Sequence, residues 1–94
     1  MTTLDENTGI RQNPRIAART LDGKTVIVVL DARKVHALNE LGSTIWNMAD
    51  GRSLKSIVEA VTAEYEVQSE IARADVSLFV EQLVSLNMLE LVIP

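Results

Sequence analysis

The chain has 94 residues, of which 47% are hydrophobic and 23% charged, and this composition indicates one folded domain rather than a disordered segment. The formal net charge of −4 is unevenly distributed, because six bases accompany four acids up to Lys34, whereas Arg73 is the only base against seven acids from Ser56 onward. An acidic C-terminal half repels phosphate, which argues against a nucleic-acid partner.

Cysteine is absent from the sequence, which excludes disulfides and thiolate chemistry and fits a reducing compartment. Residues 1–14 lack the apolar core of a secretory signal, and no apolar run approaches the roughly 20 residues needed to span a bilayer. We therefore expect a cytoplasmic protein with no membrane partner.

The first residues are polar and show no sustained periodicity. Residues 1–13 are therefore predicted to be a flexible N-terminal segment, followed by one domain over residues 14–94. Within that domain, Asp22-Gly23 separates two strand-like runs at 15–20 and 25–30, and this dipeptide strongly favours a two-residue type I′ hairpin.

The second run is apolar except at Thr25, which is typical of a central strand covered on both faces. A turn at 31–33 then leads to a third strand over 34–38. The resulting three-stranded meander leaves this third strand on an edge.

Three helices are predicted next. Asn39 is the expected N-cap of the first helix and Gly51 its C′ residue, while Ser53 and Ser69 are expected to cap the second and third helices. The third helix is predicted to run to about Asn87, and residues 89–93 could form a short closing strand. Apolar residues recur at helical spacing in the first two helices: Leu38, Leu41, Ile45 and Met48, then Leu54, Ile57, Val58, Val61 and Tyr65.

These elements predict an α+β, winged-helix-like fold, in which an N-terminal three-stranded antiparallel meander precedes a three-helix bundle. Trp46, the single tryptophan, either packs at the seam between helix and sheet or lines a groove.

The third helix carries two faces. Val76, Phe79, Val80 and Leu83 form the stripe expected to face the core. A second face groups Ile71, Asp75, Leu78 and Gln82. This second face has two interpretations: it packs on the sheet as further core, or it forms one wall of a peptide groove whose other wall is the third strand.

The third strand is weakly protected as an edge, since only Lys34 and His36 guard it and it has neither proline nor glycine. An extended peptide could add there as a fourth strand. The alternative is a plain edge shielded by Lys34 or by the chain's own termini.

Nothing in the sequence is arranged for catalysis. His36 is the only histidine and has no cysteine or second histidine to complete a metal site. No carboxylate pair, nucleophile–base pair or glycine-rich phosphate loop is present. We expect a protein that is not an enzyme and that needs neither metal nor cofactor.

An ordered set of residues resembles the PqqD family, small winged-helix domains also called recognition elements for the precursors of ribosomally synthesised and post-translationally modified peptides (RiPPs). The resemblance spans about residues 14–90. The residues that carry it are Leu38-Asn39, Ile45, Asp50-Gly51, Arg52-Ser53-Leu54, Ile57, Asp75-Val76, Phe79, Leu83 and Leu89.

The resemblance implies a non-catalytic adaptor that binds the leader of a precursor peptide and presents it to a maturation enzyme, often a radical-SAM protein. It implies that the leader lies antiparallel to the third strand. The implied peptide-binding residues are Lys34, Val35, His36 and Ala37 on the strand, with Ile71, Asp75, Leu78 and Gln82 on the helix.

Two segments depart from the family pattern. Residues 30–33 replace a tyrosine-proline type turn found in the pyrroloquinoline quinone pathway, and Asn87 replaces a glycine. Asparagine tolerates the left-handed conformation, so the second change is mild.

Two other functions compete with peptide recognition. A winged-helix DNA-binding regulator would read DNA with residues 69–87, where acids outnumber the single Arg73, opposite to what phosphate contact needs. A purely structural or oligomerising domain is the other alternative. Pairing of two third strands could also give a homodimer.

Overall fold

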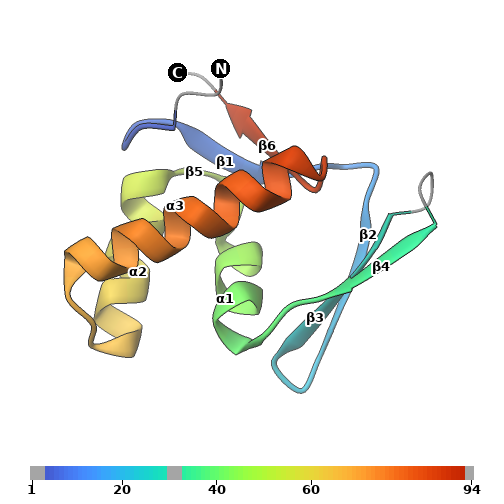
Figure 1. The fold of residues 1–94 in the computed structure, drawn as a ribbon, viewed down its shortest axis with the longest axis horizontal. Helices are drawn as coiled ribbons and strands as arrows, with labels where there is room; N and C mark the ends of the chain where they lie inside the picture. Colours follow the sequence, from blue (N-terminus) through green and yellow to red (C-terminus); the bar gives the residue numbers. More distant parts are fainter. Residues whose placement is uncertain (1–3, 30–32, 93–94) are drawn as a thin grey trace.

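The computed structural model describes residues 4–29 and 33–92, which form two three-stranded antiparallel sheets and three helices (Figure 1). Strand order is β5-β1-β6 in one sheet and β2-β3-β4 in the other. The elements are β1 (Gly9–Gln12), β2 (Ala17–Leu21), β3 (Lys24–Val29), β4 (Lys34–Ala37), α1 (Glu40–Met48), β5 (Asp50–Ser53), α2 (Leu54–Tyr65), α3 (Ser69–Ser85) and β6 (Leu89–Val92).

The predicted meander is confirmed as β2-β3-β4. Leu21 pairs with Lys24, and the two residues between them have the positive φ values of a type I′ turn, 53° at Asp22 and 77° at Gly23. Of the turn predicted at 31–33, residues 31 and 32 lie outside the described residues, as does residue 30, while Arg33 has a φ of 51°.

The central strand β3 is covered on one face only. Ile27 is fully buried, but Val26 and Val28, whose side chains lie on the opposite face, are only partly buried. The prediction that both faces are covered is therefore wrong. The covered face rests on α1, and the sheet extends from the helical body as a twisted arm (Figure 1).

A second sheet was not predicted. The expectation of a flexible segment through Asn13 is wrong for residues 9–12, which form β1, the central strand of this sheet. β1 pairs with β6 along its full length and with β5 on its other side, and Ile10 is fully buried. The domain therefore includes β1, and its predicted start at residue 14 is wrong. Four residues are too few to show a period, and their partners lie far away in the sequence.

Gly51 belongs to β5 and is not the C′ residue of α1, so that prediction is wrong. The helix ends at Met48, and the chain passes directly into the strand with a φ of 105° at Gly51. A Cβ on Gly9 would lie 2.8 Å from the Gly51 carbonyl oxygen. Glycine at position 9 thus permits the close approach of β1 to β5.

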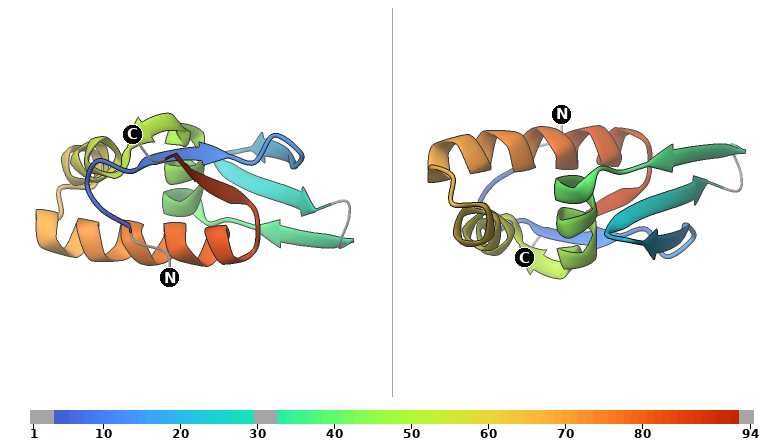
Figure 2. Two further views of the ribbon diagram at one scale, coloured as in Figure 1. Left: turned by 90° about the horizontal axis from the view of Figure 1, so that it is seen from above. Right: turned by 90° about the horizontal axis from the view of Figure 1, so that it is seen from below.

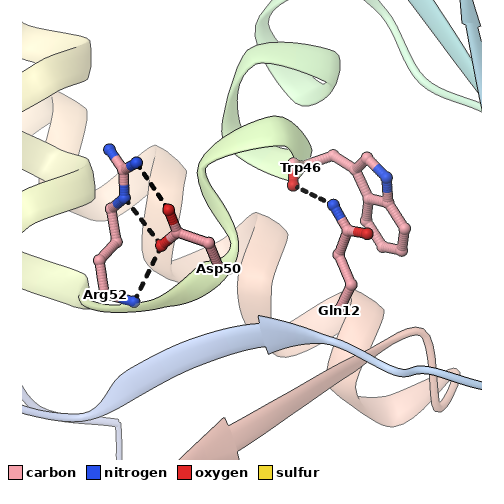
Figure 3. Close-up of polar contacts among 4 residues, drawn as sticks. All are labelled: Gln12, Trp46, Asp50 and Arg52. Atoms are coloured by element: carbon pink, nitrogen blue, oxygen red, sulfur yellow. Dashed lines mark hydrogen bonds and ion pairs between the residues drawn. The ribbon is translucent and has the colours of Figure 1, made fainter.

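The strand β5 carries an exposed ion pair (Figure 3). Arg52 donates from Nε and an Nη atom to the two carboxylate oxygens of Asp50, at 3.0 and 2.8 Å, and its backbone N–H donates to Oδ1. Nearby, Gln12 Nε2 donates to the Trp46 carbonyl oxygen at 2.8 Å, which ties β1 to the end of α1.

These hydrogen bonds from Arg52 lower the pKa of Asp50 from 3.8 to about 2. Because the folded-state pKa is lowered, any stabilisation by this pair is present above the unfolded pKa and is lost as the pH falls through about 2. We expect NMR titration of the Asp50 carboxyl carbon to give a pKa of about 2. In Arg52→Ala this pKa should rise toward its usual value, whereas Lys55→Ala should leave it unchanged. An unaltered titration curve in Arg52→Ala would contradict the assignment.

Two of the three predicted helix caps are confirmed. Asn39 Oδ1 accepts from the Gly42 N–H at 2.8 Å, and Ser53 Oγ accepts from the Ser56 N–H at 3.2 Å. The prediction for Ser69 is wrong, since Gln68 occupies the N-cap position of α3 without a side-chain hydrogen bond. α3 ends at Ser85, and the φ of 59° at Asn87 is the left-handed conformation expected there.

The core lies between the helices and the two sheets. Val76 and Val80 of α3 are fully buried and Leu83 nearly so, which confirms most of the predicted stripe, while Phe79 is partly buried. Trp46 is 2% exposed, so the alternative that it lines a groove is wrong. The α+β class, the meander and three helices are confirmed, and the winged-helix likeness stays a prediction.

Candidate functional site

β4 is an edge strand of the sheet formed by β2, β3 and β4. Among the described strands, β4 pairs with β3 alone. The Leu38 N–H donates to the Thr25 carbonyl oxygen at 2.8 Å, so in the alternation of an antiparallel ladder Val35 and Ala37 direct their N–H and C=O groups away from β3. The backbone of these two residues is thus oriented to pair with an added strand.

A buried hydrogen bond fixes this edge against α1. The Thr25 N–H donates to Ser43 Oγ at 2.7 Å, and both residues are buried. With the bond from Leu38, it holds the start of β3 and the end of β4 onto the first turns of α1. The strand edge therefore has a defined position relative to the helices.

The side chains of β4 divide between two faces. Lys34 and His36 lie opposite Val29 and the buried Ile27, on the inner face, whereas Val35 is 67% exposed on the outer face with Ala37. Both views in Figure 2 show β4 as the strand of its sheet nearest to α3. Of the four predicted strand residues, two therefore offer side chains to the space beside α3 and two offer backbone groups.

The second face of α3 is exposed. Ile71 and Leu78 are 52% and 57% exposed, and Asp75 and Gln82 are exposed as well. The interpretation that this face is further core is therefore wrong. The exposed Leu78, close to the end of β4, is the kind of side chain that the groove interpretation requires, whereas Ile71 lies in the first turn of α3.

Between α1 and α3 lies a hollow that we call the apolar hollow. Its residues are Asn39, Leu41, Gly42, Ile45, Asp75, Leu78, Phe79 and Gln82. Three of the four predicted helix residues line it, and Ile71 does not. A Cβ on Gly42 would meet the Phe79 ring at 2.9 Å, so glycine leaves room for this ring in the wall.

A second hollow, which we call the basic hollow, lies between β4 and the C-terminal end of α3. It is lined by Val29, Lys34, His36, Ser85, Leu86, Asn87 and Met88. Leu41 and Phe79 line the apolar hollow and Leu86 lines the basic hollow, although the sequence did not predict these three as site residues. Leu86 is 39% exposed and follows α3 directly. It stands four positions after Gln82, so extending the helical spacing of the second face would have indicated it.

Within residues 4–29 and 33–92, no group of three or more histidine, cysteine or acidic side chains could hold a metal ion. No helix in the same part of the chain is long and apolar enough to cross a membrane.

The fold matches solved structures of peptide-recognition domains. TbiB1 in complex with the TbiA(beta) leader peptide has a TM-score of 0.80 and 26% identity, over 85% of this chain and 94% of that chain. Lasso peptide synthetase B1 complexed with the leader peptide has a TM-score of 0.76 and 26% identity, over 86% of this chain and 96% of that chain. The PqqD truncation of Methylobacterium extorquens PqqCD, a stand-alone RiPP recognition element, shares this fold at 18% identity with a TM-score of 0.76, over 95% and 96%.

Two sheets, three helices and a groove at an open strand edge thus define a domain with the fold of RiPP recognition elements. The profile of the family described as coenzyme PQQ synthesis protein D (PqqD) matches residues 24–89, and the chain belongs to this family. No curated protein matches its sequence.

Proposed function

We propose that this protein is a non-catalytic adaptor that binds the leader of a ribosomally synthesised precursor peptide and presents it to a modifying enzyme, such as a radical-SAM protein. The observation that carries the proposal is the open edge of β4 beside the exposed Leu78 of α3. The leader would lie antiparallel to β4 as a fourth strand. Two structural neighbours were solved with leader peptides, which supports this class of ligand.

The free-energy balance of such binding is feasible. Ordering a leader that is disordered before binding costs roughly 2–5 kcal/mol, and micromolar affinity requires a net binding free energy of about −8 kcal/mol. The backbone groups of Val35 and Ala37 supply directional hydrogen bonds, and the two hollows supply the burial of side chains. Isothermal titration calorimetry tests the proposal. The ligands are synthetic leader peptides encoded by precursor-peptide genes that neighbour the gene of this protein. Micromolar binding is expected, and no binding to any of them would overturn it.

DNA binding has less support from the structure. The one cation of α3, Arg73, donates to the Glu6 carboxylate at 2.8 Å. The same helix carries Glu70, Asp75 and Glu81, whose negative charges repel the phosphates of DNA. We therefore propose no nucleic-acid partner. Pairing of two β4 edges in a homodimer would compete with the leader for the same backbone groups.

The variant Val35→Pro tests strand addition directly. Proline removes the outward N–H of Val35 but none of the hydrogen bonds to β3, so the fold should persist. One net hydrogen bond contributes about 0.5–1.5 kcal/mol, so leader binding should weaken roughly three- to tenfold in titration calorimetry.

Ala18→Pro is the matched control, because Ala18 directs its N–H outward at the other edge of the same sheet. It should leave the dissociation constant unchanged. Equal weakening by both proline variants would mean that the leader does not pair specifically with β4.

A further inference from the structure

Two hollows along α3 lie near opposite ends of β4 and differ in chemistry, the apolar hollow near Asn39 and the basic hollow beside Lys34 and His36; the groove comprises both. The apolar hollow presents Leu41, Leu78 and Phe79, with Asp75 at its rim. The basic hollow presents the amino group of Lys34 and the imidazole of His36, and the described residues that line it include no carboxylate. A bound strand therefore meets an apolar surface beside one acid at one end and two nitrogen donors at the other.

We propose that this groove selects leaders in which an apolar residue precedes an acidic residue by four positions, an inference that rests on the proposed function. The apolar side chain enters the apolar hollow, and the carboxylate of the aspartate or glutamate contacts Lys34 and His36. Lys34 and His36 are thus the specificity-determining residues of the site.

The length of the groove sets the spacing of the two side chains. Leu78 in the apolar hollow and Leu86 in the basic hollow are eight positions apart on α3 and its C-cap. At about 1.5 Å per helical residue, the hollows lie roughly 12 Å apart. A strand covers this length in about four residues at ~3.3 Å each, and an even number places both side chains on the same face.

The direction of β4 sets the order of the two side chains. β4 runs from Lys34, beside the basic hollow, toward Asn39, beside the apolar hollow. A peptide antiparallel to β4 reaches the apolar hollow first, so its apolar residue stands N-terminal to the acid. The reverse order would place the acid beside Asp75, where like charges repel.

The C-terminal end of α3 opposes this selection weakly. Its last carbonyl groups carry roughly half an elementary negative charge, which disfavours an anion nearby. Lys34 carries a full positive charge, and His36 offers a ring N–H donor in either protonation state. The balance therefore favours a carboxylate, and the preference should decline as salt rises because Lys34 is exposed.

Selection from a displayed library of random twelve-residue peptides on the immobilised protein tests this inference. Enriched peptides should carry an aliphatic or aromatic residue followed four positions later by Asp or Glu. Changing that acid to its amide should weaken binding of a synthetic peptide roughly three- to tenfold, a modest factor for an exposed pair.

Lys34→Glu should replace the selected acid by Lys or Arg and keep the apolar residue, with the thermal unfolding curve unchanged. Lys24→Glu, at the hairpin turn, should leave the selection unaltered. Failure to enrich any peptide would count against the proposed function itself. Two results would overturn only this inference: enriched peptides that share an apolar residue but no acid, or an acid that is still selected by Lys34→Glu.

Discussion

Replacing Leu78 with lysine is expected to weaken leader binding by roughly ten- to hundredfold, which corresponds to about 1.4–2.8 kcal/mol. Leu78 lines the apolar hollow and is 57% exposed in the free protein, so a bound leader would cover this exposed part of its side chain. Lysine loses this apolar burial and brings a charge that binding would remove from water. Titration calorimetry with a leader peptide measures the change.

The fold should tolerate this variant because Leu78 is exposed and the core stripe of α3 lies on another face of the helix. Val67→Lys is the matched control, since Val67 is also an exposed aliphatic residue but precedes α3 and lines neither hollow. A folded Leu78→Lys protein with an unchanged dissociation constant would remove α3 from the binding site.

The sequence predicted those parts of the fold whose signals are local. Asp22-Gly23 specifies its turn through backbone conformation, and Asn39 and Ser53 specify helix starts through their side-chain oxygens. The sheet formed by β5, β1 and β6 has no such local signal. Each of its strands is four residues long, and its pairing joins residues 9–12 to residues 50–53 and 89–92. Only tertiary contact selects these conformations.

The position of the candidate site residues in the fold was predicted in part, because only some of the signals for it are local. Helical periodicity placed Leu78 and Asp75 on a face away from the core, and exposure confirms that separation. The sequence did not indicate which β4 side chains face α3. The alternation of a strand gives two faces but does not say which of them is turned toward the helix. The buried Ile27 opposite His36 decides this, and the binding role of these residues stays a prediction.

The variant Ile10→Ala tests whether β1 is part of the folded domain. Ile10 is fully buried in the central strand of its sheet, and removing a buried aliphatic side chain of this size costs about 2–5 kcal/mol through lost burial and the cavity left behind. This is a large share of the roughly 5–15 kcal/mol that stabilises a domain. Urea unfolding followed by circular dichroism should show a clearly lower midpoint with an unchanged slope.

Leu21→Ala is the control for this experiment, since Leu21 is 62% exposed at the end of β2 and should change the midpoint little. A flexible N-terminal segment would predict equal stability for both variants and the parent protein. The difference between Ile10→Ala and Leu21→Ala therefore measures how far β1 stabilises the sheet. The Gln12 N–H also donates to the carbonyl oxygen of Ala49, the C-cap residue of α1, so weakening β1 should loosen the helix that forms one wall of the apolar hollow. At a urea concentration just below the unfolding midpoint of Ile10→Ala, this variant should therefore bind leader more weakly than Leu21→Ala does at the same concentration.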